Sequence, residues 1–330
     1  AQTYKALVVR ESSEGQFARR IENCKVTDLP PGDVLVQVRY SALNYKDALS
    51  ATGNRGVTRR FPHTPGIDAA GQVAESSQAD FVPGDEVIVT SYDLGMNTAG
   101  GFGGYIRVPA GWVVKKPAGL SLKESMILGT AGFTAGLSVM KLVQGGVAPK
   151  DGEVLVTGAT GGVGSLAVAI LAKAGYSVVG ASGKADDHAF LTDLGAKQVI
   201  DRDQARDESG RPLLKARWAG VVDTVGGDYL ATAIKSAAPW SIVTCCGNVA
   251  SPKLDTTVFP FILRGVTLCG IDSQNCPMPL RQTVWDKLAS AWKPGDLEGL
   301  CSTVALAGLD PKIDAILKGQ LKGRTVVTHD

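Results

Sequence analysis

The sequence predicts an α/β protein of two domains, in which a β-rich domain precedes a doubly wound parallel sheet. Its 330 residues exceed what one compact core usually holds. Short β-like runs broken by glycine and proline fill residues 5–117, and strand-like and helix-like runs alternate from residue 152 to 272. The first domain is therefore expected to hold antiparallel strands and the second domain parallel strands.

The β-rich domain is predicted to span residues 1–125 and to form an antiparallel barrel or sandwich. Its strand-like runs follow one another without intervening helices, and they are KALVVR, DVLVQVRY, GQVAES, DEVIVTSY and YIRVPAGWVVKKP. After Ser121 the pattern changes, because LKESMILGTAGFTAGLSVMKLV carries apolar residues at helical spacing. The boundary between the domains is therefore predicted within residues 120–128.

The second domain is predicted to span residues 126–273. Helix-like runs separate several of its strand-like runs, which are EVLVTGA, YSVVGAS, QVIDRD, AGVVDTVGG, SIVTCCG and VTLCGID. This alternation is typical of a parallel, doubly wound sheet. Residues 274–330 hold two helix-like runs and the strand-like run RTVVT, too little for a core of their own. They are predicted to return to the first domain.

Composition and charge restrict the partners of the chain. Hydrophobic residues make up 44% and charged residues 20%, as in ordinary globular proteins. The net charge of +2, from 34 basic and 32 acidic residues, provides no broad basic field for nucleic acid or a membrane surface. Apolar runs fall short of membrane-spanning length, and the six cysteines include no CxxC pair, so a cytoplasmic protein with reduced, buried thiols is expected.

A glycine-rich turn follows the first strand of the alternating segment. The run EVLVTGA leads into Gly158-x-x-Gly161-x-x-Gly164, and the helix-like run SLAVAILAKAG follows directly. In this context the first glycine permits a sharp turn, the middle glycine lets backbone N–H groups approach a pyrophosphate, and the last lets helix and strand pack closely. The motif predicts dinucleotide binding, against the alternative of a glycine-rich turn without a ligand.

The end of the second strand of this unit, VVGASGK, indicates which dinucleotide is bound. An NAD site usually places an acidic residue there for the ribose 2′-hydroxyl, and none is present. Ser182 and Lys184 offer a hydroxyl and an ammonium, which suit the 2′-phosphate of NADPH. Asp186 and Asp187 lie beyond the turn and are interpreted as the start of the next helix. Arg202, after the third strand, either contacts the same phosphate or the adenine face, or is a solvated side chain.

Seven stretches give the chain a family resemblance, and together they span nearly the whole sequence: LNYKDAL (43–49), PGIDAAG (65–71), GTAGFTA (129–135), GATGGVG (158–164), DTVGG (223–227), PFILRGVTLCGIDS (260–273) and GRTVV (323–327). In these stretches the chain resembles the medium-chain dehydrogenase/reductase superfamily. Within it the chain is similar to the zinc-independent acryloyl-CoA reductase group, also described as quinone oxidoreductase-like. The resemblance implies a GroES-like β-barrel catalytic domain, completed by the C-terminus, and a Rossmann domain.

The resemblance also draws attention to missing zinc ligands. Zinc-dependent members place a cysteine in the region 44–47 and a His-Glu pair where this chain has Ile67-Asp68. The loop LGMNTAGGFGG lacks the cysteines of a structural zinc lobe, and His63, His188 and His329 have no ligand spacing, so no metal is expected. Reduction of a conjugated C=C bond needs only an oxyanion partner and a proton donor, which favours it over alcohol oxidation.

The implied reaction is the NADPH-dependent reduction of acryloyl-CoA, with hydride delivered to the β-carbon. Asn44 and Tyr45 are the candidate catalytic residues, since an amide N–H can hold the enolate oxygen and a phenol can donate a proton or bind the nicotinamide ribose or amide. Either side chain could instead be structural. The cofactor contacts that the resemblance carries over fall on Tyr45, Thr160, Gly161, Gly162, Val163, Ser182, Gly183, Lys184, Arg202, Asn248 and Ser273.

Three further expectations concern partners. In NRGVTRRF, the residues Arg55, Arg59 and Arg60 are either contacts to CoA phosphates or solvated surface. The electron acceptor is acryloyl-CoA or, alternatively, a quinone or a free α,β-unsaturated ketone, and a non-catalytic, NADPH-binding or redox-sensing protein can have the same fold. A homodimer is expected, because VTLCGID is a long, apolar edge strand that needs a cover.

Overall fold

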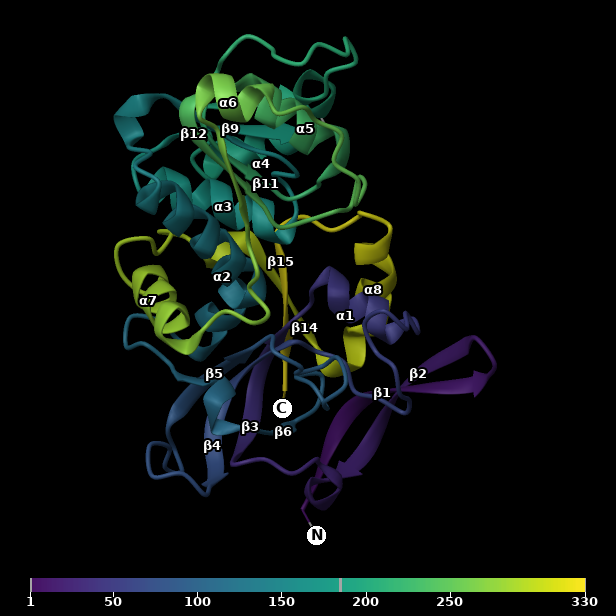
Figure 1. Ribbon diagram of the computed structural model, residues 1–330. Coiled ribbons are helices and arrows are strands. Elements are labelled where there is room, and N and C mark those ends of the chain that lie inside the picture. Colours follow the sequence, from purple (N-terminus) through teal and green to yellow (C-terminus); the bar gives the residue numbers. More distant parts are fainter. Residues whose placement is uncertain (1, 184–185, 330) are drawn as a thin grey trace. The chain divides into compact units, whose positions relative to one another are not determined.

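The computed structural model describes residues 2–183 and 186–329 and divides into two compact units (Figure 1). The first unit contains the chain up to Thr130, Gln274–Thr283 and the chain from Asp296 onward. The second unit contains Ala131–Ser273 and Val284–Gly295. The sequence-based boundaries differ in two respects, since the units divide after residue 130 and residues 284–295 do not go with the rest of the C-terminal segment.

The reassigned stretch packs on the second unit through large apolar side chains. Val284, Trp285 and Leu288 are completely buried. The Trp285 ring stacks on that of Phe133, with centroids 6.2 Å apart. A Cβ atom on Gly136 would lie 2.8 Å from the Val284 side chain, so this contact is close. These contacts join residues far apart in sequence, and the prediction that residues 274–330 return as one piece is corrected for this stretch.

The first unit is built mainly from antiparallel strands. Its larger sheet has the strand order β14 (Cys301–Ala305), β15 (Arg324–Thr328), β3 (Val34–Ala42), β4 (Asp68–Ser76), β5 (Glu86–Thr90) and β7 (Val113–Lys115), and β6 (Tyr105–Val108) pairs with β3. Only the β14–β15 pair is parallel among the described strands of this sheet. A separate hairpin joins β1 (Thr3–Ser13) to β2 (Gln16–Lys25). The predicted β-rich domain is confirmed.

Helices of the first unit are short and connect its strands. α1 (Tyr45–Ala51) follows β3, and α8 (Asp310–Leu317) precedes β15. α7 (Met278–Leu288) begins in this unit and ends in the second. α1 and α8 contact one another, and apolar residues from both, including Ala48 and Ile313, share a core cluster with Leu7 and Phe102. This packing holds α1 against the rest of the first unit.

α2 (Leu122–Gln144) is long and apolar enough to cross a membrane by length and composition alone. This corrects the statement that apolar runs of the sequence fall short of that length. The helix is mostly buried inside the protein, as a core helix is. It is also interrupted at Gly129, whose φ of 52° and ψ of −155° are not helical.

The second unit is a doubly wound parallel sheet, as predicted. Its strand order is β10 (Gln198–Asp201), β9 (Ser177–Ser182), β8 (Glu153–Val156), β11 (Trp218–Asp223), β12 (Ala237–Cys245) and β13 (Thr267–Gly270), and every neighbouring pair is parallel. The connections include α3 (Gly162–Lys173), α4 (Asp187–Asp193), α5 (Gly227–Ser236) and α6 (Phe259–Arg264). The order reverses between β8 and β11, and ligands of such sheets bind at that switch point.

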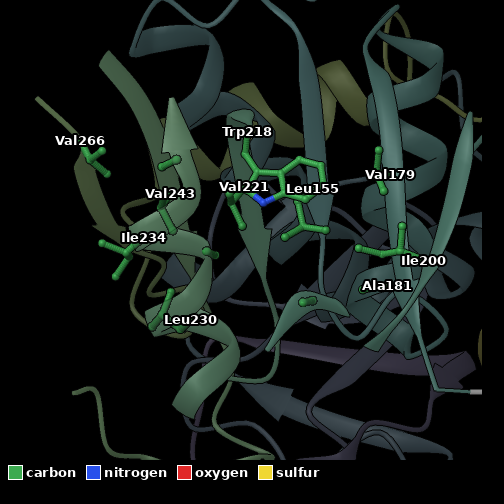
Figure 2. Packing of buried hydrophobic residues seen from close by; sticks show 13 residues of the cluster. Leu155, Val179, Ala181, Ile200, Trp218, Val221, Leu230, Ile234, Val243 and Val266 are labelled. Carbon is green, nitrogen blue, oxygen red and sulfur yellow. The ribbon is translucent and has the colours of Figure 1, made fainter. Parts of the chain in front are cut away.

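Buried side chains from neighbouring strands hold this sheet together (Figure 2). Leu155, Val179, Val221 and Val243 come from four adjacent strands, and Ile234 of α5 packs against them. Each is at most 1% exposed, so each contributes roughly 1.5–3 kcal/mol through burial. The packed sheet therefore gives a rigid base to the turns at its carboxyl edge.

Candidate functional site

The carboxyl edge of the parallel sheet carries most of the residues predicted to bind a dinucleotide, whereas Tyr45 lies on α1 of the first unit. Residues 160–163 follow β8 and lead into α3, Ser182 ends β9, Arg202 follows β10, Asn248 follows β12 and Ser273 follows β13. Parallel strands end at one edge of a sheet, so the fold brings together residues more than 100 positions apart. Lys184 lies outside the described residues.

The glycine turn after β8 closes so tightly that side chains do not fit. Gly158 has a φ of +57°, and a Cβ atom on it would lie 2.3 Å from the Thr224 Oγ1 atom. A Cβ atom on Gly164 would lie 2.0 Å from the Gly158 carbonyl oxygen. α3 starts at Gly162, and the first N–H groups of a helix have no acceptor within it. The turn thus fits a pyrophosphate, which these N–H groups would bind.

The end of β9 combines a hydroxyl, a cation and a carboxylate. A Cβ atom on Gly183 would lie 2.7 Å from the Arg202 Nε atom, so the guanidinium of Arg202 packs over this glycine. The Ser182 hydroxyl donates to Asp187 Oδ2 at 3.0 Å, and Asp187 is 2% exposed. Asp187 does begin α4, as expected, but its bond to Ser182 was not foreseen. Arg202 therefore brings a positive charge to the end of β9, where the sequence predicts the cofactor ribose.

A buried polar cluster connects the turns after β8, β11 and β12. Asp223 is completely buried, accepts from the Thr157 hydroxyl at 2.8 Å and accepts from the backbone N–H of Gly226 at 2.9 Å. Thr157 Oγ1 also accepts from the Thr224 N–H at 3.0 Å. A Cβ atom on Gly247 would lie 1.9 Å from the Thr224 carbonyl oxygen, so the turn after β12 packs closely on this residue.

No cation neutralises Asp223 among its described contacts, since its partners are a hydroxyl and backbone N–H groups. Burial raises the pKa of the Asp223 carboxyl, and the hydrogen bonds from Thr157, Gly226 and Val225 oppose that rise. Neither Thr157 nor Asp223 was singled out from the sequence. The stretch DTVGG belongs to the family resemblance, but the contact spans 66 residues and has no local signal.

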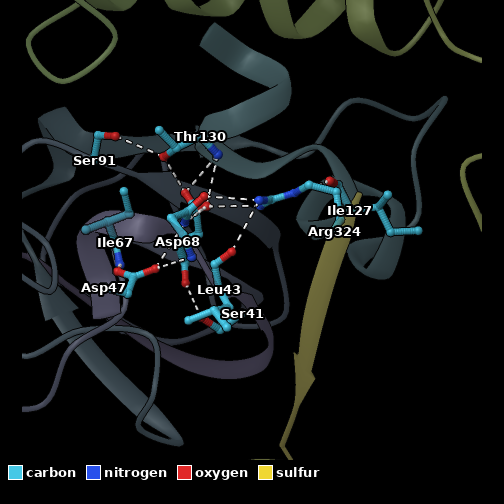
Figure 3. A network of polar contacts seen from close by, with 10 residues as sticks. Ser41, Leu43, Asp47, Ile67, Asp68, Ser91, Ile127, Thr130 and Arg324 are labelled. Atoms are coloured by element: carbon cyan, nitrogen blue, oxygen red, sulfur yellow. Dashed lines mark hydrogen bonds and ion pairs between the residues drawn. The ribbon is translucent and has the colours of Figure 1, made fainter. Parts of the chain in front are cut away.

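In the first unit, a second polar network joins Asp47, Asp68 and Arg324 (Figure 3). Asn44 belongs to the same network. The Asn44 side-chain amide donates to Asp68 Oδ2 at 2.8 Å and to Asp47 Oδ2 at 3.1 Å. Its Oδ1 atom accepts from Arg324 Nη1 at 3.2 Å. Both amide hydrogens thus have carboxylate acceptors. The prediction that this amide N–H holds an enolate oxygen is not supported by the geometry.

The carboxylates of this network are completely buried and receive many donors. Asp68 accepts from the backbone N–H and the hydroxyl of Thr130, and its Oδ2 atom lies 3.9 Å from Arg324 Nη2. Asp47 accepts from the backbone N–H groups of Asn44 and Ile67, both at 2.8 Å. A Cβ atom on Gly129 would lie 2.6 Å from Asp68 Oδ2, so the break in α2 lets the backbone pass beside this carboxylate.

Burial dominates the electrostatics of this network. It raises the pKa of Asp47 to about 7, with a further increase from the charge of Asp68. Burial also raises the pKa of Asp68, while the charge of Arg324 and the hydrogen bonds from Thr130 and Asn44 lower it. Burial lowers the pKa of Arg324, and the carboxylates of Asp68 and Asp47 oppose that shift. The network therefore contains two buried carboxyl groups and a single guanidinium group.

Tyr45 differs from its neighbours because it reaches solvent. It is the first residue of α1, is 43% exposed and has no hydrogen-bond partner for its phenol within the described residues. Asn44 caps the helix, and its backbone N–H donates to Asp47 three residues later. The buried network thus fixes the start of α1 and leaves the Tyr45 side chain available.

Candidate metal ligands do not cluster in residues 2–183 and 186–329, where no three His, Cys, Asp or Glu side chains could hold an ion together. Ile67 and Asp68 occupy the position at which the sequence comparison expected a His-Glu pair in zinc-dependent relatives. Asp68 is engaged there by Thr130 and Asn44.

Comparison with known proteins gives two family-model matches. One is "Alcohol dehydrogenase GroES-like domain" over residues 30–118, and the other is "Zinc-binding dehydrogenase" over residues 162–290. "Acrylyl-CoA reductase AcuI" of Ruegeria pomeroyi is 42% identical over 325 residues, which cover 98% of each chain. "Putative quinone oxidoreductase YhfP" of Bacillus subtilis is 43% identical over 318 residues, covering 96% of each.

Solved structures agree with these matches. The YhdH oxidoreductase of Salmonella enterica, in complex with NADP, has a TM-score of 0.95 at 43% identity and matches 99% of this chain and 100% of its own. The Bacillus subtilis protein YhfP, with NAD bound, has a TM-score of 0.97 at 42% identity over 100% of both chains.

The chain therefore belongs to the medium-chain dehydrogenase/reductase superfamily of oxidoreductases. Within that superfamily it falls in the group that includes the AcuI, YhdH and YhfP proteins, as the sequence resemblance predicted. The GroES-like and Rossmann architecture is confirmed by the same matches.

Proposed function

We propose that this protein is an NADPH-dependent reductase that converts acryloyl-CoA to propanoyl-CoA. The observation that carries the proposal is the 42% identity with an acrylyl-CoA reductase over 98% of both chains. Two features of the fold support it. The glycine turn fits a pyrophosphate, and α1 presents an exposed phenol on a rigid base.

Bound NADPH supplies the hydride that adds to the β-carbon of the thioester. The α-carbon then takes up a proton, so that one C=C bond becomes a single bond and the thioester is retained. Tyr45 is the proposed donor of that proton or, alternatively, a hydrogen-bond partner that orients the cofactor or substrate. Asn44 is proposed to position Tyr45 by fixing the start of α1, because its amide hydrogens already bind Asp47 and Asp68.

NADPH is proposed in preference to NADH, although related structures contain either cofactor. Support comes from Arg202, which packs over Gly183 at the end of β9, and from the absence of an acidic residue in VVGASGK. A guanidinium there favours a 2′-phosphate. The buried carboxylate of Asp187, which accepts from Ser182, is the feature that would favour a ribose hydroxyl instead.

The test is a comparison of acceptors under identical conditions. NADPH consumption is measured with acryloyl-CoA, crotonyl-CoA and a quinone. Turnover that is strong with acryloyl-CoA and weak with the quinone supports the proposal. Turnover confined to the quinone favours the second candidate, a quinone reductase, which the name of the YhfP relative suggests. No turnover with any acceptor, while NADPH binds, points to a non-catalytic binding protein.

A homodimer is proposed as the assembled form. Support comes from the exposed edge of the second unit, where β13 ends the sheet. Large apolar side chains of β12, α6 and the segment before it are exposed there: Trp240 (80%), Val258 (63%), Ile262 (68%) and Leu263 (63%). A second copy would cover this surface. Light scattering of the purified protein at micromolar concentration tests the proposal, and a monomeric mass would contradict it.

A cytoplasmic location is likewise proposed. No disulfide joins the six cysteines, all of which lie within the described residues. This is the expected state in a reducing compartment. Cell fractionation with an antibody to the protein tests it.

A further inference from the structure

The loop after α1 is held firmly in the first unit. Thr58 is completely buried, and its hydroxyl lies 2.6 Å from the hydroxyl of Ser50 on α1. The carbonyl of Asn54 accepts from the N–H groups of Val57 and Thr58, both at 3.0 Å. The Arg59 N–H donates to Asn97 Oδ1 at 3.1 Å. The backbone that carries the next two arginines is therefore fixed before any ligand binds.

The three arginines of this loop differ in what they contact. Arg55 is engaged within the protein: it forms an ion pair with Glu11 at 2.6 Å and donates to the Arg59 carbonyl at 2.8 Å. Its guanidinium also lies over the rings of Phe17 and Phe61, at 5.6 and 5.2 Å from their centroids. Arg55 therefore stabilises the loop and is not proposed as a ligand contact.

Arg59 and Arg60 are both exposed, and neither guanidinium forms an ion pair with any residue in the described part of the chain. Two carboxylates bind residues that contact this loop, and both already have partners. Glu11 pairs with Arg55, and Asp93 accepts from the side chains of Asn97 and Thr98. Two like charges on adjacent residues of a fixed loop repel one another, and an anion would relieve that repulsion.

We infer that Arg59 and Arg60 bind the phosphate groups of the CoA nucleotide, an inference that rests on the proposed function. The loop packs on the C-terminal half of α1, whereas Tyr45 stands at the other end of that helix. Seven helical residues span about 10 Å. The pantetheine arm of CoA is longer than this helix, so a thioester near Tyr45 leaves the nucleotide phosphates able to reach the loop that carries the two guanidinium groups.

The test compares a full and a truncated thioester. Acryloyl-CoA carries the nucleotide, and the acryloyl thioester of N-acetylcysteamine lacks it. Both are assayed with NADPH in the wild type, in Arg59→Ala/Arg60→Ala and in Arg20→Ala. Arg20 is a matched control, because it is exposed on β2 and forms no ion pair with a described residue.

The double variant should raise KM for acryloyl-CoA about tenfold to a hundredfold with little change in kcat, and added salt should shrink the difference. KM for the truncated thioester should not change, and Arg20→Ala should behave as wild type. An unchanged KM for acryloyl-CoA, or equal losses on both thioesters, would overturn the inference. A wild type that reduces neither thioester would instead overturn the proposed function.

Discussion

Both units of the molecule bury a carboxylate without exposure to solvent, but they stabilise it differently. In the first unit, Asp68 faces Arg324, and the network also includes a second carboxylate, Asp47. In the second unit, Asp223 is surrounded by a hydroxyl and backbone N–H groups. A buried charge can thus be accommodated by an opposite charge or by dipoles alone.

The two networks also differ in the segments that they join. The network of the first unit joins β4, the break in α2 and β15, and it connects residues up to 281 positions apart. The network of the second unit joins turns that meet at one edge of a sheet. Loss of the first network should lower the free energy of unfolding, whereas loss of the second should lower it and also weaken cofactor binding.

The largest effect is expected for Arg324→Met. This change leaves Asp47 and Asp68 buried without their cation, and breaking such a pair costs about 3–5 kcal/mol. The free energy of unfolding, measured by urea titration, should fall by that amount. Arg20→Met, on the exposed face of β2, is the control and should change it by less than about 0.5 kcal/mol. A loss below about 1 kcal/mol in Arg324→Met would contradict this account of the network.

Asp223→Ala should have the next largest effect. It leaves the Thr157 hydroxyl and the Gly226 N–H without their acceptor, at a cost of roughly 1–3 kcal/mol each. Because these groups fix the glycine turn, the Kd for NADPH should also rise in protein that remains folded. Asp223→Asn keeps one acceptor oxygen and should lose less of both. If the affinity for NADPH is unaltered in Asp223→Ala, the Asp223 cluster does not contribute to cofactor binding.

A third prediction concerns the end of β9, where Arg202 lies over Gly183 and Ser182 donates to the buried carboxylate of Asp187. Arg202→Ala, and likewise Lys184→Ala, should weaken NADPH binding about tenfold to a hundredfold and hardly affect NADH. Fluorescence titration of both cofactors measures this. Lys173→Ala, at the opposite end of α3, is the control. Equal losses for NADPH and NADH would mean that these cations do not contact the 2′-phosphate.

The last prediction concerns pH, where the effect is smallest when it is expressed per pH unit. The pKa of Asp47 is raised to about 7 by burial and by the charge of Asp68, and in the unfolded chain it returns to about 4. Between these values the folded protein retains a proton that the unfolded chain has lost. The contribution of Asp47 to the free energy of unfolding should therefore fall as pH rises from about 4 to about 7, by at most about 1.4 kcal/mol per pH unit.

Urea titrations between pH 5 and 8 measure that slope. Asp47→Asn should flatten it, because the substituted amide does not titrate in this range. Asp33→Asn is the control, since hydrogen bonds from Ala110 and Gln78 lower the pKa of Asp33 and place its titration below this window. A slope that is unchanged in Asp47→Asn would assign the effect to another group.

The sequence allowed the second unit to be predicted more completely than the first. Alternation of strands and helices and the glycines at 158, 161 and 164 are local patterns, and they predicted a parallel, doubly wound sheet. In the first unit, β2 and β14 were missed. β2 is a polar, largely exposed strand and lacks a buried alternating face. Its pairing with β1, and that of β14 with β15, can be recognised only in the fold.

The candidate site shows the same limit. The position of the candidate cofactor residues at the carboxyl edge of the sheet could be predicted because the resemblance and the strand ends coincide. The role of Asn44 could not, because its acceptors Asp47 and Asp68 and its donor Arg324 lie 3, 24 and 280 residues away. The bond between Ser182 and Asp187 was missed for another reason, since an acidic residue at a helix start has an adequate local explanation.

The close contact between Gly164 and Gly158 in the glycine turn also limits which mutations this position can accept. Any single-base change in a glycine codon that alters the amino acid introduces a Cβ atom, and at Gly164 that atom would meet a backbone oxygen at 2.0 Å. Alanine is thus as incompatible there as aspartate or tryptophan. In a pool of all single substitutions under selection, position 164 should tolerate none of them, whereas Gly210, with open space around it and a φ of +70°, should tolerate asparagine.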